Sequence, residues 1–284
     1  MASETADDQF MRVSALLGDD RVKRLQDAHV LVVGVGAVGS FCLESLVRSG
    51  VGRVTIVDAD DVTFSNINRQ LVAYHSTVGK SKVEVAAKRV LDLNPNCKVT
   101  PLHQFVTIEG VATLLDQVKP DVVADCIDSV REKIALIAAC KRSGVAIVSS
   151  MGAARHRDLS KIHAADISKT SMCPLARKVR KHMKDVRREG RKAPTVAIYS
   201  SEEPAKHQRG DCLGSMCVIT GTFGLRVGGE VLRLLLDGQK SEAASPSETD
   251  KEAEKEEVVV TTKTETETET ESGMEVETAQ TDKE

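Results

Sequence analysis

A glycine-rich turn between two β-branched runs is the feature that most constrains how this chain can fold. Residues 29–36 read HVLVVGVG and residues 53–60 read RVTIVDAD, and continuous apolar runs of this kind are typical of strands buried on both faces. The segment between them, SFCLESLVRSG at 40–50, has helical spacing and a glycine stop. A strand, a helix and a strand in this order predict one parallel βαβ unit.

The same alternation continues along the chain. Further strands are expected at 98–106, 121–129 and 145–154, and helices at 21–26, 80–95, 109–118 and 131–144. Alternating strands and helices predict an α/β fold with a doubly wound, Rossmann-like and mostly parallel sheet. In such a sheet the ligand lies at the carboxyl ends of the strands.

The pattern changes after residue 154. Short strands are expected at 161–167 (KIHAADI) and 195–201 (TVAIYSS), with a very basic helix at 173–192 between them and an apolar helix at 221–238. We therefore expect residues 155–238 to form a smaller α+β portion. Residues 1–9 are polar and are expected to be flexible. The charged, low-complexity stretch 239–284 is expected to be a disordered tail.

Charge is distributed unevenly between the tail and the rest of the chain. The whole sequence has 39 Lys and Arg against 42 Asp and Glu, of which five basic and fifteen acidic residues lie in 239–284. This leaves 34 basic and 27 acidic residues in 1–238, a net charge of +7 against −10 in the tail. A basic body favours polyanionic partners. Aromatic residues make up only 2% of the chain, which argues against a surface on which bases stack.

The cysteines argue for a reducing compartment and against zinc. There are seven, at positions 42, 97, 126, 140, 173, 212 and 217. Their odd number indicates reduced thiols, and because no two form a CxxC pair we expect no zinc. No apolar run reaches the roughly eighteen residues that a membrane span needs, so we expect no membrane insertion. Without a secretory leader the chain is predicted to be cytoplasmic, although a partner could hold it at an organelle surface.

Gly34, Gly36 and Gly39 form a GxGxxG motif directly after a strand and before a helix. Such glycines let the backbone approach a phosphate, while the helix N-terminus offers N–H groups and a partial positive charge. The motif predicts a bound nucleotide and by itself does not choose between NAD and ATP.

Charged residues downstream of the motif favour a triphosphate. Asp58 ends the second strand, from which a carboxylate reaches ribose hydroxyls. Arg69 and Lys82 add positive charge at the same edge of the sheet. Because the glycine loop already satisfies the pyrophosphate of NAD, further cations point to additional phosphate oxygens.

Asp128, in DCIDS at the end of a later strand, is the candidate magnesium ligand. Magnesium takes oxygen ligands and usually only one or two from the protein. Asp125 is the alternative, but its place within the strand favours a buried structural role. Among possible bases, His156, His163 and His207, no spacing singles one out.

These residues and their surroundings resemble a known family. The glycines, Asp58, SNINRQ (65–70), Lys82 and DCIDS are similar to the adenylation domain of ubiquitin-activating enzymes and of the bacterial sulfur-carrier activators ThiF and MoeB. More narrowly, QFMRVSALLG (9–18), VGKSKVEVAAKRVLDLNP (78–95), SSMGAA (149–154), ADISKTSMCPLARKVRK (165–181) and IYSSEEPAK (198–206) resemble the tRNA threonylcarbamoyladenosine dehydratase branch. The resemblance covers about residues 9–238.

The resemblance implies an enzyme that uses ATP and Mg²⁺ and acts on tRNA. The branch activates the carboxylate of threonylcarbamoyladenosine at position 37 of certain tRNAs and closes it to a cyclic form, with net loss of water. Superfamily analogy favours an acyl adenylate over an acyl phosphate as the activated form. Site positions transfer residue by residue: the ATP contacts are Gly34, Gly36, Gly39, Asp58, Asn66, Arg69 and Lys82, the magnesium ligand is Asp128, and the catalytic group is Arg12, Arg69, Lys82 and Asp128.

The resemblance also implies partners. Arg12 matches an arginine that reaches into the ATP site of a neighbouring subunit, which implies a homodimer. With tRNA as the expected substrate, the basic helix supplies candidates for phosphate contacts, namely Arg177, Lys178, Arg180 and Lys181. Without a tRNA substrate, such a helix would more simply be a solvated face. Gly152, in the loop MGAAR (151–155), is expected to line the substrate carboxylate site because the loop follows a strand end beside Asp128.

Two other classes of protein are weighed against this hypothesis. An activating enzyme for a ubiquitin-like or sulfur-carrier protein would have a zinc pair, a cysteine domain or a ubiquitin-fold domain, and none is visible in the sequence. A noncatalytic scaffold would have lost its ATP positions. Whether a sulfur-relay or cysteine-desulfurase partner is needed is left open. We therefore predict an ATP-binding Rossmann-like domain at 10–154 and a substrate- and tRNA-binding portion at 155–238.

Overall fold

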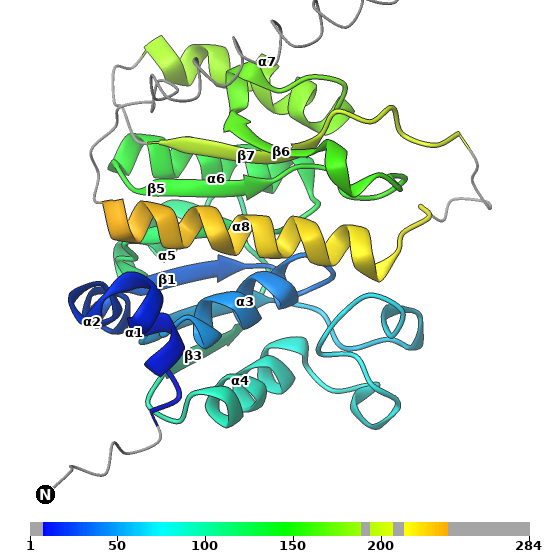
Figure 1. Ribbon diagram of the computed structural model, residues 1–284. Helices are drawn as coiled ribbons and strands as arrows, with labels where there is room; N and C mark the ends of the chain where they lie inside the picture. Colours follow the sequence, from blue (N-terminus) through cyan, green and yellow to red (C-terminus); the bar gives the residue numbers. More distant parts are fainter. Residues whose placement is uncertain (1–7, 189–193, 207–212, 238–284) are drawn as a thin grey trace, which may run out of the picture. The chain divides into compact units, whose positions relative to one another are not determined.

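The fold is built on one seven-stranded sheet in the order β3-β2-β1-β4-β5-β7-β6 (Figure 1). The computed structural model describes residues 8–188, 194–206 and 213–237. The strands are β1 His29–Val33, β2 Arg53–Asp58, β3 Lys98–His103, β4 Val122–Asp125, β5 Ala146–Ser150, β6 Ile162–Asp166 and β7 Thr195–Ser200. All of them run parallel except β6, which pairs antiparallel with β7 at the edge. The predicted doubly wound, mostly parallel α/β fold is confirmed.

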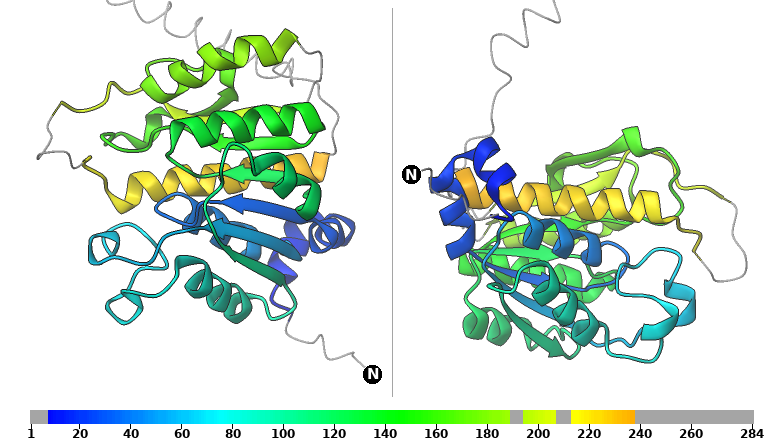
Figure 2. Two further views of the ribbon diagram at one scale, coloured as in Figure 1. Left: turned by 180° about the vertical axis from the view of Figure 1, so that it is seen from behind. Right: turned by 60° about the horizontal axis from the view of Figure 1, so that its bottom comes forward.

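Helices cover both faces of the sheet (Figures 1 and 2). One face carries α3 Gly39–Arg48, α4 Lys82–Leu93 and α8 Cys217–Asp237, and the other carries α5 Val111–Val118 and α6 Val130–Ser143, with α7 Pro174–Arg188 packed on α6. Two short helices, α1 Met11–Leu17 and α2 Asp19–Asp27, precede β1 and lie at the amino ends of the strands. This layering leaves the carboxyl ends of the strands to loops.

The core forms two layers separated by the sheet. All five residues of β1 are buried, and successive side chains point to opposite faces. Val30 and Val32 pack among residues of α3 and α8, whereas Leu31 and Val33 pack among residues of α5, α6 and α7. The continuous apolar run seen in the sequence therefore reflects a central parallel strand with both faces covered.

Residues 155–237 complete the same sheet. In this part of the chain β7 pairs parallel with β5, β6 adds the antiparallel edge, and α8 returns across the sheet to pack on α3. The short strands and the two helices expected here are present. The functional boundary at residue 154 stays a prediction, and the expectations for residues 1–7 and 239–284 lie outside the described residues.

Several element bounds differ from expectation: β3, β4 and β5 end at His103, Asp125 and Ser150 rather than at 106, 129 and 154, and α2 and α4 begin at Asp19 and Lys82 rather than at 21 and 80. Helix α1 was not expected from periodicity, because none of its side chains is buried and it therefore carries no apolar core stripe. Helix α8 begins at Cys217, four residues before the expected start at Gly221. Across the described ranges, no helix has the combination of length and hydropathy needed to cross a membrane.

Helices α3 and α8 pack with their backbones unusually close, because α8 presents glycines to α3. A methyl group on Gly224 would lie 2.3 Å from the Val38 carbonyl oxygen, and one on Gly228 would lie 2.0 Å from the Ser45 Oγ. Gly229, one residue further along the helix, is exposed and has no such neighbour within 4 Å. Helix α8 therefore holds α3, the helix that begins at the glycine-rich turn.

Replacing Gly224 with Ala should separate α8 from α3 and lower the free energy of unfolding by about 1–3 kcal/mol, the usual cost of overpacking a dense core. Gly229→Ala is the matched control, and it should raise stability by up to about 1 kcal/mol because Ala favours helix. Chemical denaturation of both variants measures the difference. Equal effects of the two substitutions would contradict the close packing.

Candidate functional site

The glycine-rich turn is shaped by close backbone contacts. Gly34 has φ +86° and donates its N–H to the Val57 carbonyl at 2.7 Å, and a methyl on Gly39 would lie 1.8 Å from the Gly34 carbonyl oxygen. A methyl on Gly36 would meet no atom this near, since its closest neighbour would be Gln70 Nε2 at 3.7 Å. The close packing of the turn thus requires glycine at positions 34 and 39. At Gly36 the missing side chain instead leaves open space beside the turn.

Asp58 ties this turn to the end of β2. Its Oδ2 accepts the Val35 N–H at 2.8 Å, and its Oδ1 accepts the Asp60 N–H at 2.9 Å. The carboxylate is half-buried, and each oxygen keeps a second lone pair. Asp58 can therefore hold the turn and still accept a hydrogen bond from a ribose hydroxyl.

Lys82 begins α4 and points its ammonium to the same edge of the sheet. Its Nζ lies 2.7 Å from Asp60 Oδ2, and its side chain is 6% exposed whereas that of Asp60 is 61% exposed. The two residues are also joined through the backbone, where Lys82 N–H donates to the Asp60 carbonyl at 3.0 Å. Because Asp60 is exposed, a phosphate could replace its carboxylate on this ammonium.

Asn66 and Arg69 lie in and just after the short turn η1, Phe64–Asn66. Asn66 is buried, and its Oδ1 accepts the Thr63 N–H at 3.2 Å in a capping box. Arg69 Nη1 donates to the Ser65 carbonyl and to Asn68 Oδ1, both at 2.8 Å. The turn thus holds the guanidinium by one nitrogen, and among the described residues Nη2 has no hydrogen-bond partner.

Gln70 is a candidate that the sequence reasoning missed. The side chain is 8% exposed, its Nε2 faces Gly36, and its Oε1 has no hydrogen-bond partner among the described residues. A buried amide oxygen without a partner is unusual and marks a place where a ligand or water completes the bonding. The only signal in the sequence is the position of Gln70 directly after Arg69.

Asp128 lies in the loop after β4 and is exposed. It has no hydrogen-bond or ion-pair partner among the described residues, and the described part of the chain contains no group of three or more His, Cys, Asp or Glu that could hold a metal. A metal at Asp128 would therefore take most of its ligands from phosphate and water, which suits Mg²⁺. Asp125 lies in the core and pairs with Lys133, in line with the structural role expected for it.

The loop with Gly152 is bound to the same segment as the turn with Asn66. Arg155 has φ +69°, a rare value for a side chain with a Cβ, and its N–H donates to the Gly214 carbonyl at 2.9 Å. Asn68 Nδ2 donates to the neighbouring Ser215 carbonyl at 3.2 Å. Residues 214–215 thus connect the two loops.

His156, at the end of this loop, is 4% exposed and its Nδ1 has no hydrogen-bond partner among the described residues. Burial lowers the pKa of His156, and the Glu202 carboxylate 3.8 Å away opposes that shift only in part. The imidazole is therefore favoured in its neutral form. His163 instead pairs with Ser201 Oγ at 2.9 Å, and His207 lies outside the described residues.

Arg12 does not join this cluster within one chain. It lies on α1 at the amino ends of the strands (Figure 1), where it lines a groove of about 490 Å³ with Leu16, Leu232 and Leu236. Leu16 is 82% exposed. The role of Arg12 in a neighbouring subunit's site stays a prediction.

The basic helix α7 separates its charges from its core contacts. Ala176, Val179 and Met183 are buried, while Arg177, Lys178 and Lys181 are exposed. Arg180 differs from its neighbours, because it is half-buried and donates from Nη1 to both the carbonyl and the hydroxyl of Thr170. Of the four candidate tRNA contacts, three are available at the surface and Arg180 is engaged in holding the chain before α7.

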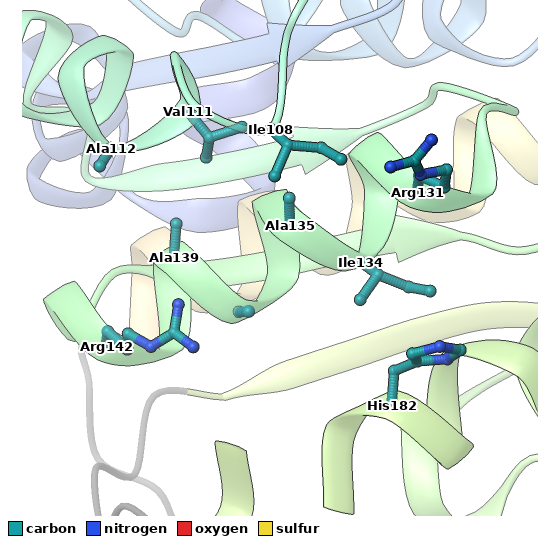
Figure 3. A pocket seen from close by; sticks show the side chains of 10 residues that line it. Ile108, Val111, Ala112, Arg131, Ile134, Ala135, Ala139, Arg142 and His182 are labelled. Atoms are coloured by element: carbon teal, nitrogen blue, oxygen red, sulfur yellow. The ribbon is translucent and has the colours of Figure 1, made fainter. Parts of the chain in front are cut away.

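A groove of about 420 Å³ runs between α5, α6 and α7 (Figure 3). Arg131 and Arg142 lie eleven residues apart on the same face of α6, with alanines between them, and His182 projects from α7. Because Arg131 is only three residues beyond Asp128, this cationic groove begins close to the candidate metal position.

The ThiF family model matches residues 8–270. This chain belongs to the ThiF family. It is 42% identical over 196 residues to the tRNA threonylcarbamoyladenosine dehydratase of Bacillus subtilis (strain 168), covering 69% of this chain and 76% of that protein. It is 36% identical over 239 residues to the tRNA threonylcarbamoyladenosine dehydratase of Escherichia coli (strain K12), covering 76% and 89%.

A solved structure adds to this comparison. The crystal structure of the Escherichia coli tRNA N6-threonylcarbamoyladenosine dehydratase in complex with ATP matches with a TM-score of 0.75 and 36% identity, covering 81% of this chain and 94% of that chain. The resemblance inferred from the sequence motifs is confirmed. The individual site residues of this ThiF family protein stay predictions.

Most thiols of this ThiF family protein are unsuited to nucleophilic chemistry. Cys42, Cys97, Cys140 and Cys173 are buried, and burial raises the pKa of the Cys97 thiol to about 11. Burial also raises the pKa of the Cys140 thiol, and because the thiolate is the reactive form, Cys97 and Cys140 stay inert at neutral pH. Cys217 is exposed at the start of α8, and Cys212 lies outside the described residues.

Asp58→Ala should weaken ATP binding to this ThiF family protein by about tenfold or more, because it would remove the predicted hydrogen bond to ribose and leave two loop N–H groups without acceptors. Asp61→Ala is the matched control, since Asp61 is an exposed carboxylate three residues away with only a 3.9 Å contact to His103. Calorimetric titration with ATP measures both. Unchanged affinity in Asp58→Ala would remove Asp58 from the site.

Proposed function

We propose that this ThiF family protein is an ATP-dependent tRNA threonylcarbamoyladenosine dehydratase. The main support is that one edge of the sheet, at the carboxyl ends of β1, β2 and β4, has the glycine turn, Asp58, Lys82 and Asp128. This edge belongs to a chain that is 36–42% identical to proteins named for that activity. The same relatives favour the tRNA enzyme over an activator of a carrier protein.

The proposed reaction begins with activation of the substrate carboxylate. A carboxylate oxygen attacks the α-phosphorus of ATP, the bond to the bridging oxygen breaks, and pyrophosphate leaves. The product is an acyl adenylate, whose carbonyl carbon is attacked by nucleophiles far more readily than that of the carboxylate. Attack by another atom of the same threonylcarbamoyl group then closes the ring and expels AMP. The oxygen lost by the substrate leaves in AMP, so the net change is loss of water.

The residues at the carboxyl edge have separate roles in this proposal. Asp58 orients ATP through the ribose, and the N–H groups of the glycine turn face phosphate oxygens. Lys82 and Arg69 stabilise the negative charge that builds up on the phosphates during attack, which lowers the barrier more than it strengthens ground-state binding. Magnesium held by Asp128 would neutralise further phosphate charge.

The proposal extends to the partners. Arg177, Lys178 and Lys181 present positive charge for tRNA phosphates, and Gly152 leaves room for the substrate carboxylate, since a methyl there would meet nothing within 4 Å. A homodimer in which Arg12 serves the second site, and a cytoplasmic location, belong to the same proposal.

Mass spectrometry of nucleosides from tRNA treated with the protein, ATP and Mg²⁺ tests the activity. The mass of threonylcarbamoyladenosine should fall by that of one water, and only when ATP is present. Arg69→Ala should abolish the conversion without lowering the thermal midpoint, since among the described residues the Arg69 guanidinium bonds only its own turn. An unchanged nucleoside mass with folded protein and ATP would reject the proposed function.

Replacing Lys178 and Lys181 together with Ala should raise the KM for tRNA and leave ATP affinity unchanged. The slope of log affinity for tRNA against log salt should become shallower by about 0.7–0.9 for each phosphate that the variant no longer neutralises. Lys23→Ala on α2 is the control, because Lys23 is also exposed but lies at the amino ends of the strands. Filter binding at several salt concentrations gives the slopes, and an unchanged slope would show that α7 does not contact tRNA.

A further inference from the structure

A fully buried ion pair lies directly beneath the Asp128 loop. Both side chains, Lys133 and Asp125, are 0% exposed, and Lys133 Nζ lies 2.8 Å from Asp125 Oδ2. Ser149, also buried, donates from its Oγ to the same carboxylate oxygen at 2.6 Å and lies 3.3 Å from the ammonium. We call these three residues the Lys133 clamp.

The clamp joins both ends of the segment that carries Asp128. Asp125 is the last residue of β4, and Lys133 lies in the first turn of α6, so the clamp closes over the loop 126–129 and the start of that helix. Within that loop the Ile127 N–H donates to Asp125 Oδ1 at 3.3 Å. The clamp thus contributes one contact to the loop backbone, beside the Cys126 N–H that donates to the Val33 carbonyl of β1 at 2.8 Å.

The third member connects the clamp to a second loop of the site. Ser149 lies opposite Asp125 in the register of β4 and β5 and stands three residues before Gly152. A single buried cation therefore contacts the strand ends that lead into the Asp128 loop and the Gly152 loop.

Stability alone does not account for such a pair. Removing two charges from water carries a large desolvation cost, and apolar side chains of similar volume often stabilise a core as well as a buried ion pair or better. Asp128 itself has no hydrogen-bond partner among the described residues, so its carboxylate is placed by the backbone that the clamp holds. Buried groups that do not themselves bind a metal commonly hold its ligands in the right orientation.

We propose that the Lys133 clamp is a positioning device that holds the Asp128 carboxylate where it would ligate a divalent cation bound with the nucleotide. The inference rests on the proposed role of Asp128 in ATP chemistry. Lys133 touches neither substrate nor metal and acts only through Asp125, Ser149 and the backbone of residues 126–129.

The test compares Lys133→Met with the double variant Asp125→Val/Lys133→Met. The single variant leaves a buried carboxylate without its cation and should lower the thermal midpoint. The double variant removes both charges and should regain most of the lost thermal midpoint. Each protein is titrated with a non-hydrolysable β,γ-imido analogue of ATP, with Mg²⁺ and with a chelator. In the wild type Mg²⁺ should strengthen binding, and in both variants this gain should shrink by about tenfold.

Three further variants sharpen the result. Asp128→Ala should lose the Mg²⁺ effect and keep the wild-type midpoint, because its carboxylate bonds none of the described residues. Ser149→Ala leaves the charges balanced and should give a smaller loss of the gain in affinity that Mg²⁺ provides. Lys141→Met, at the far end of α6, is the control and should behave as the wild type.

A double variant with both a recovered midpoint and the wild-type gain from Mg²⁺ would overturn the proposal, because the clamp would then be purely structural. A wild-type Mg²⁺ response in Asp128→Ala would also overturn it, since Asp128 would not be the metal ligand. These titrations need no tRNA. A clamp effect without any change in tRNA nucleoside mass would therefore support the clamp and reject the dehydratase.

Discussion

The contact between the Gly34 carbonyl and Gly39 is the constraint on which the rest of the structure depends. Because a Cβ at Gly39 would lie 1.8 Å from that oxygen, α3 can follow β1 after the short turn 34–38 only with glycine there. On its other side α3 is held by Gly224 of α8, which approaches the Val38 carbonyl. Helix α3 is thus fixed between the central strand and the last helix of the described chain, and its first N–H groups face the carboxyl edge of the sheet.

Most of the charged side chains at that edge already have hydrogen-bond or ion-pair partners within the protein. Asp58 accepts two backbone N–H groups, Lys82 pairs with Asp60, and Arg69 bonds its own turn. Asp58 and Arg69 therefore need little rearrangement when charge develops on a phosphate, which is the physical basis of electrostatic catalysis, whereas Lys82 must exchange Asp60 for the phosphate. Asp128 is the exception among the expected charged ligands of this edge, because its side chain lacks such a constraint. The buried Lys133 clamp below it constrains the backbone of its loop instead.

The order of strands and helices was predictable because β-branched runs and helical spacing are strong local signals, and the edge of the sheet that carries the site follows from parallel topology. The sequence could not reveal which charged residues are buried. Lys133 lies in a helix rich in Lys and Arg and reads as exposed, and only the approach of β4 and β5 makes it a core residue. In the same way, Arg180 reads as one more surface cation until its contact with Thr170 is seen. Such pairings depend on long-range contacts that no local pattern encodes.

If ATP activates a carboxylate of the tRNA, the fate of the carboxylate oxygens will show it. Threonylcarbamoyladenosine labelled with oxygen-18 in its carboxylate can be converted in one turnover and the nucleotide products weighed by mass spectrometry. We predict one labelled oxygen in AMP and none in pyrophosphate. Cyclised tRNA formed together with unlabelled AMP and unlabelled phosphate would contradict it, because the lost oxygen would not have passed through ATP.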